Sequence, residues 1–398
     1  MRAKPHFHRL WGLNIKEESI PNENRDGQMM VAKGLEGVIV DTSSISLIDG
    51  NAGRLSYRGY DIHDLAENLS FEETAYLLWN GELPTKTQLA DLKKHLSDER
   101  PLSANLKTLV KSLPTSADTL DVLRTVISTL GTGLPLKKPD ISDAIAITAK
   151  IPTINAAFNR VRHGQELMDP RPDLGHAANY LYMLTGEEPN PVKVEAFNKY
   201  LILLADHSMN SSTFTARVVA STWSDMHSAI TAAICALKGP LHGGAPAPVL
   251  RMLQTIGEPD RAESWLREEI KEGRRLMGFG HRVYRTTDPR AEILRSIASC
   301  TADKNFFELA KHVEETGIRV LQEFYPRRKL YTNVEFYSAV VMHSVGLPPD
   351  LFTASFAASR SAGWSANVLE QVANNRLIRP EVEYTGPKDR KVTPLISR

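Results

Sequence analysis

The stretch Gly37–Ile62, GVIVDTSSISLIDGNAGRLSYRGYDI, is the β-forming part of the sequence, and a helical remainder follows it. β-branched residues are frequent in it, and the turn-forming run Asp49–Gly53 lies between Ile45–Ile48 and Leu55–Tyr57. Two short apolar runs joined by such a turn are typical of a β-hairpin. We therefore predict one small N-terminal hairpin and no other convincing strand region.

From Phe71 onward the apolar residues follow a helical period. Ala75, Leu78 and Trp79 recur at the spacings of three and four residues that mark the buried face of a helix. Glycine and proline separate the apolar runs at intervals that suit helix ends. These patterns predict an all-α fold that is mainly helical apart from the hairpin.

The composition is that of an ordinary globular protein. Of the 398 residues, 42% are hydrophobic and 24% are charged, which argues against a disordered or fibrous chain. The 48 Lys and Arg residues balance 47 Asp and Glu residues, so the basic excess of a protein that coats nucleic acid or an anionic membrane is missing. We expect neither nucleic acid nor a membrane as a partner.

The two cysteines and the apolar runs exclude several other classes. Cys235 and Cys300 are too few for a disulfide framework, and no Cys/His spacing suits a zinc site. We expect two reduced, mostly buried thiols. The longest apolar stretch, Ala229–Leu237, is far shorter than the ~20 residues that a membrane-spanning helix needs.

The first 33 residues are predicted to be a polar extension. They lack the continuous apolar core of a secretory signal, and they carry Glu17, Glu18, Glu23 and Asp26, whereas organelle-targeting peptides avoid acidic residues. We therefore expect a soluble, cytoplasmic protein.

Four segments combine His, Arg, Asn and acidic side chains with glycines or helix ends, a mixture that suits chemistry better than packing. These segments are Leu204–Thr213 (LADHSMNSST), Lys238–Ala245 (KGPLHGGA), Met277–Arg290 (MGFGHRVYRTTDPR) and Asn333–Ser338 (NVEFYS). The third is the hardest to explain as structure alone, because a solvated charge run needs no Gly-Phe-Gly, which lets the backbone approach a flat group.

Each of these features also has a purely structural interpretation. His207 alone could be a histidine on a helix face, and the glycines after His242 could simply form a turn. Glu335 could favour the positive end of a helix that Asn333 caps. Arg360, in an otherwise apolar helical run, could be a structural residue with a carboxylate partner.

Taken together, the residue types suggest chemistry on a small polycarboxylate. Arg290, Arg360 and Arg379 supply planar guanidinium groups, which bind carboxylates in a bidentate way. A carboxylate abstracts a proton next to a carbonyl when an electrophile stabilises the enolate, and a neutral histidine supplies that stabilisation. The interpretation is carbon–carbon bond chemistry on a polyacid.

The same segments resemble the citrate synthase family, either the short type II citrate synthases or the 2-methylcitrate synthases. The resemblance is carried by GFGHRVYRTTDPR at 278–290 and GPLHGG at 239–244, and by the runs at 34–46, 55–66 and 359–371. It extends from Gly34 to the C-terminus.

The resemblance implies a homodimer with a two-domain, almost wholly helical fold. The large domain would comprise residues 34–240 and 345–398, and the small domain 241–344 would close over the substrates. The family condenses oxaloacetate with acetyl-CoA and water to citrate and free CoA, an acyl transfer of the tricarboxylic acid cycle. No metal and no tightly bound cofactor are implied, because the coenzyme A thioester is a substrate.

The resemblance also implies the catalytic roles. His242 would hydrogen bond to the thioester oxygen, His281 would polarise the oxaloacetate carbonyl, and Glu335 stands where the family has its base. His207 would contact oxaloacetate, with Asn210 nearby.

For binding, the resemblance implies a set of arginines and one loop. Arg290 and Arg360 would hold the carboxylates of oxaloacetate, and Arg379 would reach the site of the neighbouring subunit. Arg285 would meet a phosphate of CoA. Four residues would cradle the adenine: Met277, Gly278, Phe279 and Gly280.

Two positions depart from the family pattern. The family base is Asp, whereas Glu335 carries its carboxylate on a side chain one methylene longer, so we expect slowed enolisation. Leu204 stands where the family often has His, three residues before His207, so we expect weaker oxaloacetate binding.

Two alternatives remain open from the sequence. A 2-methylcitrate synthase that uses propionyl-CoA needs the same residues and only room for one more methyl group, a difference of roughly 1–3 kcal/mol. A catalytically weak paralogue would explain the two departures but not the retained histidines and arginines. Aldol chemistry that depends on a metal is disfavoured, because the segments hold no metal-binding cluster.

Overall fold

The computed structural model describes residues 31–243, 246–281 and 283–397. By their contacts the residues form two units, Ser43–Ile378 and a terminal unit of Met1–Thr42 with Arg379–Arg398. In the terminal unit, short 3₁₀ helices lie at Lys33–Leu35 and Leu395–Ser397. Most of the predicted polar extension, residues 1–30, lies outside the described residues.

The predicted hairpin is confirmed, with one short strand added. Strands β1 (Ser46–Asp49), β2 (Arg54–Tyr57) and β3 (Tyr60–Asp61) form an antiparallel sheet in the order β1-β2-β3. Ser46 lies opposite Tyr57 in the β1–β2 register. The extra strand arises because the chain reverses tightly after β2.

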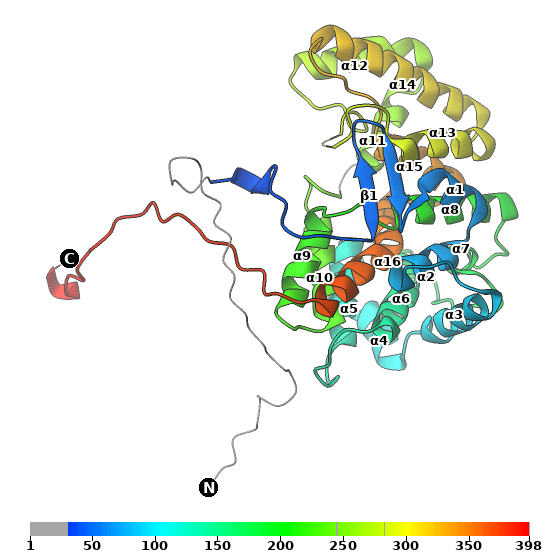
Figure 1. Cartoon of the computed structure of the whole chain (residues 1–398). Coiled ribbons are helices and arrows are strands. Elements are labelled where there is room, and N and C mark those ends of the chain that lie inside the picture. Colours follow the sequence, from blue (N-terminus) through cyan, green and yellow to red (C-terminus); the bar gives the residue numbers. More distant parts are fainter. Residues whose placement is uncertain (1–30, 244–245, 282, 398) are drawn as a thin grey trace. The chain divides into compact units, whose positions relative to one another are not determined.

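The rest of Ser43–Ile378 is helical, as predicted (Figure 1). Ten helices precede the second segment: α1 (Ile62–Asn68), α2 (Phe71–Asn80), α3 (Lys86–Glu99), α4 (Ala104–Ser112), α5 (Thr119–Leu130), α6 (Ile141–Arg162), α7 (His176–Thr185), α8 (Pro191–Leu204), α9 (Ser211–Ser221) and α10 (Met226–Leu237). The later described helices are α11 (Pro246–Ile256), α12 (Ala262–Lys271), α13 (Pro289–Thr301), α14 (Lys304–Phe324), α15 (Val334–Val345) and α16 (Phe352–Ala373), with 3₁₀ turns at Pro259–Arg261 and Pro349–Leu351.

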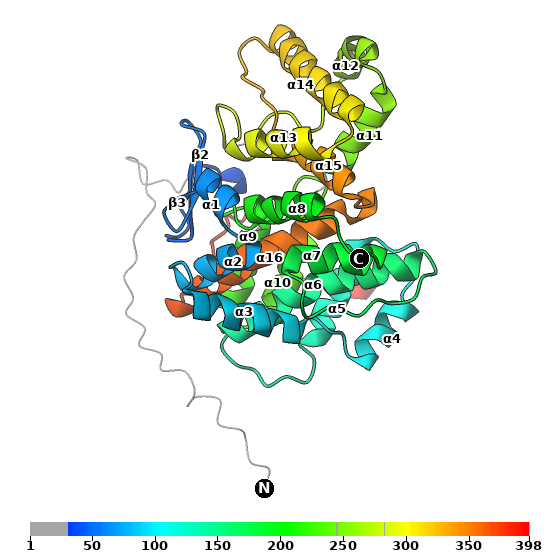
Figure 2. The same ribbon diagram turned by 90° about the vertical axis from the view of Figure 1, so that its right-hand side faces the viewer.

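Helix α16 is the centre of the packing (Figures 1 and 2). It contacts α2, α6, α8, α9 and α10, and most of its residues are buried. Its small residues allow close approach. The Gly363 N–H donates to the Ala205 carbonyl at 3.1 Å, and a Cβ at Gly363 would lie only 2.2 Å from that oxygen. The chain just after α8 is therefore pressed against α16.

Helices α11 to α15 gather at one end of this unit in Figure 1. Helix α15 contacts α11 and α13, and α12 contacts α14. Their contacts with the other helices include those of α8 with α13 and α15, of α1 with α13 and of α16 with α11. The division into a large domain (34–240 and 345–398) and a small domain (241–344) stays a prediction.

The cysteine prediction was wrong about burial. Cys235 and Cys300 are free, as expected, but both are exposed. They lie on the outward sides of α10 and α13, where a helical period places them away from the core. In the described part of the chain, no helix is long and apolar enough to cross a membrane.

Candidate active site

The third and fourth segments lie side by side, although some fifty residues separate them in sequence. The Asn333 N–H donates to the Gly278 carbonyl at 2.9 Å, and the Asn333 side-chain amide donates to the Gly280 carbonyl at 3.0 Å. Both glycines have positive φ, at 85° and 80°, which other residues rarely adopt. Asn333 also caps α15, as predicted, because its Oδ1 accepts the Glu335 N–H at 3.1 Å.

His281 is held in one tautomer by its own loop. Its Nδ1 lies 3.0 Å from the N–H of Val283 and 3.1 Å from the N–H of Tyr284. Because both neighbours are donors, Nδ1 is the acceptor and the proton of the neutral ring resides on Nε2. Burial, with the positive charge of Arg290, lowers the pKa of His281 to about 4. The ring is therefore neutral at neutral pH, with an N–H free to polarise an oxygen.

Arg290 is anchored by the aspartate of the Asp-Pro-Arg turn. Its Nε and Nη2 donate to Asp288 Oδ1 and Oδ2 at 3.0 and 2.7 Å, and both side chains are buried. Burial opposes the charge, but the Asp288 carboxylate outweighs it, so the pKa of Arg290 lies above its ordinary value. Asp288 also caps α13. This partner was not recognised in the sequence, although its position two residues before the arginine was a usable signal.

Arg360 is buried on α16 and faces the end of α8. Its Nε donates to the Leu204 carbonyl at 2.7 Å, and its guanidinium carbon lies 4.5 Å from the centre of the Phe356 ring. Burial lowers the pKa of Arg360 to about 10, while the Asp206 carboxylate acts in the opposite direction. The group therefore stays charged at neutral pH. Its direct partner is a main-chain carbonyl rather than the carboxylate that the residue types suggested.

Asp206 is a buried carboxylate that the sequence analysis did not single out. Its Oδ2 accepts the Ser46 hydroxyl at 2.5 Å and the Ser208 N–H at 3.0 Å, and its Oδ1 accepts the Asn367 amide at 3.1 Å. Burial raises the pKa of Asp206, whereas the charge of Arg360 lowers it. The signal available in the sequence was an acid directly before His207.

His207 contacts the third segment. Its Nε2 lies 3.3 Å from the Tyr284 hydroxyl, and its ring meets the His281 ring edge to face with centres 5.5 Å apart. Burial, reinforced by Arg290 and Arg360, lowers the pKa of His207 well below its ordinary value. Two neutral imidazoles and two cationic guanidinium groups therefore share one region.

Asn210 and His242 are joined through a serine that the sequence analysis passed over. The Ser212 Oγ lies 2.8 Å from His242 Nε2 and 2.8 Å from Asn210 Oδ1. It also accepts the Trp364 indole N–H at 3.0 Å. Asn210 caps α9 by accepting the Thr213 N–H, so its amide has a structural task as well. Burial, with the charge of Arg360, lowers the pKa of His242 to about 4.

Glu335 lies in the first turn of α15 and is partly buried. Burial raises its pKa, the positive charge of Arg290 lowers it, and Asp288 and Arg360 also act on it. The carboxylate therefore belongs to the same electrostatic environment as the two arginines. A raised pKa makes it a better proton acceptor than a fully solvated carboxylate.

The predicted adenine cradle, Met277 to Gly280, has its aromatic ring turned inward. Phe279 is buried, 5.4 Å from the Phe336 ring, and a Cβ at Gly317 would lie 2.4 Å from it. Phe279 thus anchors the loop in the core rather than presenting its face to a ligand. Met277 is partly buried, and Arg285, later in the same segment, is exposed.

Three further observations limit the site. Arg379 belongs to the terminal unit, so its approach to a neighbouring site stays a prediction. Gly244 and Ala245, at the end of the second segment, lie outside the described residues. Among the described residues, no group of three or more His, Cys, Asp or Glu side chains is arranged to hold a metal ion.

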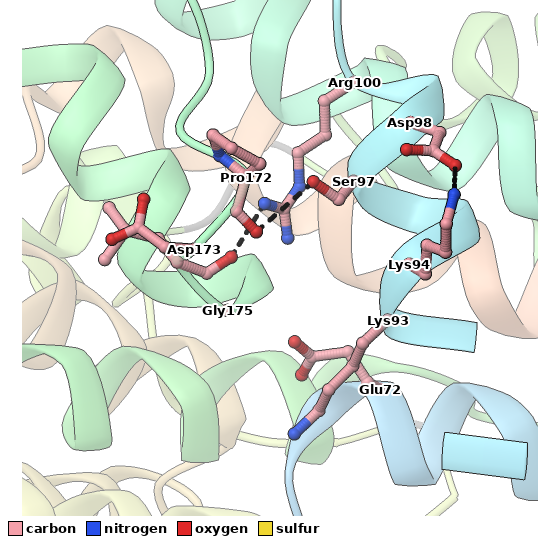
Figure 3. Close-up of a pocket in the computed structure, with 10 residues that line it drawn as sticks. Glu72, Lys93, Lys94, Ser97, Asp98, Arg100, Pro172, Asp173 and Gly175 are labelled. Carbon is pink, nitrogen blue, oxygen red and sulfur yellow. Dashed lines mark hydrogen bonds and ion pairs between the residues drawn. The ribbon is translucent and has the colours of Figure 1, made fainter. Parts of the chain in front are cut away.

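A cavity of about 370 Å³ lies elsewhere, between α2, α3 and the loop before α7 (Figure 3). Buried Arg100 donates to the Leu174 carbonyl there at 2.7 Å, and Lys94 pairs with Asp98. None of the predicted site residues lines this cavity. The cavity is therefore separate from the histidine and arginine cluster.

Comparison with known proteins gives a consistent result. A family model described as "Citrate synthase, C-terminal domain" matches residues 34–381. Citrate synthase 2 of Bacillus subtilis is 47% identical over 380 residues, which cover 93% of this chain and 100% of that protein. 2-Methylcitrate synthase 2 of Corynebacterium glutamicum is 41% identical over 383 residues, which cover 92% and 98%.

Solved structures agree with the sequences. Citrate synthase from Thermotoga maritima superposes with a TM-score of 0.83 at 42% identity, covering 93% of this chain and 99% of that chain. The Thermoplasma acidophilum enzyme, solved with carboxymethyl coenzyme A and oxaloacetate, gives a TM-score of 0.86 at 34% identity, covering 93% and 100%. The predicted helical fold is therefore confirmed.

Proposed function

Because the chain belongs to the citrate synthase family, we propose that it condenses oxaloacetate with acetyl-CoA and water to give citrate and free CoA. The observation that supports this most directly is the shared environment of His207, His281, Arg290, Arg360 and Glu335. It combines anion-binding groups, neutral hydrogen-bond donors and one carboxylate base, which are the parts that such a condensation requires.

Oxaloacetate would bind between the two arginines. Arg290 is pre-oriented by Asp288 and Arg360 by the Leu204 carbonyl, so little rotamer freedom is lost when a carboxylate arrives. The Nε2–H of His281 would then polarise the ketone of oxaloacetate, and His207 would hydrogen bond to the same substrate. Asn210 would support this contact because its side-chain amide donates to the His207 and Ser208 carbonyls, at 3.3 and 3.2 Å.

Glu335 would take a proton from the methyl group next to the thioester. His242 would stabilise the resulting enol by a hydrogen bond to the thioester oxygen, and the enol carbon would attack the polarised ketone. Hydrolysis of the citryl thioester then releases CoA. Closure of the small domain 241–344 over the large domain would exclude water until the new bond has formed.

We propose that the CoA thioester is a substrate and that the chain uses no metal and no tightly bound cofactor. The backbone of Gly278 and Gly280, with Met277, would lie against the adenine, while the inward Phe279 keeps this loop rigid. Exposed Arg285 would meet a phosphate. We further propose a cytoplasmic homodimer in which Arg379 completes the site of the partner subunit.

A second candidate, 2-methylcitrate synthase, is favoured by the similarity to the Corynebacterium glutamicum protein of that name. Both reactions use the same residues. They differ in whether the site has room for the additional methyl group of propionyl-CoA. A thiol-release assay with oxaloacetate and either acetyl-CoA or propionyl-CoA distinguishes them. We expect higher kcat/KM with acetyl-CoA.

His242→Ala is the matched control in that assay, and we expect it to reduce CoA release by at least ~10²-fold with either donor. A higher kcat/KM with propionyl-CoA would reassign the chain to the second reaction. Ligand binding without any CoA release would instead support a catalytically weak paralogue.

A further inference from the structure

Tyr284 contacts both of the neighbouring site histidines. Its main-chain N–H lies 3.1 Å from His281 Nδ1, and its hydroxyl lies 3.3 Å from His207 Nε2. Its ring centre is 4.7 Å from that of His281 and 5.8 Å from that of His207. One residue therefore touches both imidazoles, once through the backbone and once through the side chain.

The direction of the hydroxyl bond follows from burial. Tyr284 is only 3% exposed, and burial raises its pKa above the ordinary value, although Arg290 acts in the opposite direction, so the phenol keeps its proton. A buried hydroxyl proton needs an acceptor. His207 Nε2 is the acceptor in hydrogen-bond contact with it in the described part of the chain, and a neutral imidazole has one such nitrogen.

We propose that Tyr284 is a positioning residue that selects the tautomers of both histidines. Its backbone N–H keeps the proton of His281 on Nε2, and its hydroxyl keeps the proton of His207 on Nδ1. The two rings would then present opposite nitrogens as donors. The effect of this arrangement on oxaloacetate binding rests on the proposed function, whereas the assignment of the two tautomers rests only on the hydrogen bonds of Tyr284.

Tyr284→Phe tests the side-chain half of the proposal, because it removes the hydroxyl and keeps both the ring and the backbone N–H. Without the hydroxyl, His207 Nε2 loses its partner and the ring populates both tautomers. We expect the KM for oxaloacetate to rise about fivefold, which corresponds to about 1 kcal/mol for one hydrogen bond. The kcat and the KM for acetyl-CoA should change by less than about twofold.

Tyr180→Phe is the matched control. Tyr180 is also buried, but its hydroxyl bonds to Ser355 Oγ at 3.0 Å on α16, away from the two histidines. We expect a lower Tm without a change in the KM for oxaloacetate. An unchanged KM in Tyr284→Phe, or an equal rise in both variants, would overturn the proposal.

A spectroscopic measurement gives a result that does not depend on turnover. The ¹⁵N spectrum of histidine-labelled wild-type protein reports which ring nitrogen carries the proton, and a His207→Asn variant identifies the signals of His207. We expect an unprotonated Nε2. A proton on Nε2 would overturn the proposal, whereas failure of the proposed function would appear separately, as wild-type protein that releases no CoA.

Discussion

Ser212 joins three residues of the site through one hydroxyl. Its oxygen accepts the Trp364 N–H, and its single proton has two candidate acceptors, His242 Nε2 and Asn210 Oδ1, each at 2.8 Å. When the proton goes to His242, the neutral ring carries its own proton on Nδ1, which suits donation to a thioester oxygen. The tautomer of His242 thus depends on whether Ser212 donates its proton to His242 or to Asn210.

Glu335 gives the first prediction at this scale. The Asn333 cap fixes the backbone at Glu335. The extra methylene therefore places the carboxylate farther from the backbone than the carboxylate of the family's Asp. We expect Glu335→Asp to raise kcat, by up to about 10²-fold if the misplacement approaches 1 Å. Steady-state condensation kinetics test this, with Glu335→Gln as the control that removes the base. No gain, or a loss, would show that the glutamate is not an impaired base.

Leu204 gives the second prediction at the residue scale. Its carbonyl orients Arg360, while its side chain is buried in the hydrophobic core. We expect Leu204→His to lower the KM for oxaloacetate, because it adds a polar group three residues before His207. We also expect a lower Tm, since a buried polar group costs ~1–3 kcal/mol when it lacks a partner. Leu204→Gln separates an imidazole effect from mere polarity, and an unchanged or raised KM counts against the idea.

At the scale of elements, the small β-sheet contacts two of the segments that form the site. Near the start of β1, Ser46 bonds to both Asp206 and the Ser208 N–H. At the turn after β1, the Gly50 carbonyl accepts the Arg285 N–H at 2.8 Å, and a Cβ at Gly50 would lie 2.4 Å from the Val283 oxygen. The hairpin therefore spans the first and third segments, and its glycine is required by that contact.

The contact between α16 and the end of α8 gives a prediction at this scale. A methyl group at Gly363 would meet the Ala205 carbonyl at 2.2 Å and Asp206 Oδ1 at 2.5 Å, so the loop that carries His207 must move. We expect Gly363→Ala to destabilise the fold by about 1–3 kcal/mol and to raise the KM for oxaloacetate.

Chemical denaturation and kinetics test the Gly363 prediction. Ala366→Gly, on the same buried helix, is the control that costs about 1 kcal/mol without touching this loop. If Gly363→Ala retains the wild-type KM, the helix contact does not set the position of His207.

At the scale of the whole molecule, burial of histidines links stability to pH. Among the residues that the structure describes, five histidines have a pKa below the ordinary value, with burial as the largest cause: His176, His207, His227, His242 and His281. The unfolded chain binds their protons below about pH 6.5, whereas the folded chain binds them only at lower pH. The free energy of unfolding should therefore fall as the pH drops from 7 to 5.

His176 isolates one such contribution outside the site. Its ring centre lies 4.9 Å from that of Phe71 with the two rings tilted by 31°, and both of its nitrogens lack a hydrogen-bond partner in the structure. Burial lowers its pKa to about 3. His176→Phe should reduce the difference in unfolding free energy between pH 7 and pH 5 by about 2 kcal/mol. Urea denaturation at the two pH values measures this. Equal pH dependence in both proteins would mean that His176 is not the buried neutral group described here.

Much of the fold and part of the site were predictable because the signals are local. The 3.6-residue period, the Asp49–Gly53 turn and the Asn333 cap act within a few residues, so the helices, the hairpin and the start of α15 follow from the sequence. The residues of the four segments were recognisable from their types and from the family resemblance. Asp288, Asp206, Ser212 and Tyr284 were not, because their partners were unknown.

Residue types and local patterns were enough to indicate a helical member of the citrate synthase family with a cationic, histidine-rich site. How the residues of that site are held together depends on contacts between distant parts of the chain. Ser46 and Asp206 are 160 residues apart, and Asn367 and Asp206 are 161 apart. Such contacts depend on helix packing, not on any local pattern. The same is true of the inward ring of Phe279, because α14 is brought against it by packing alone.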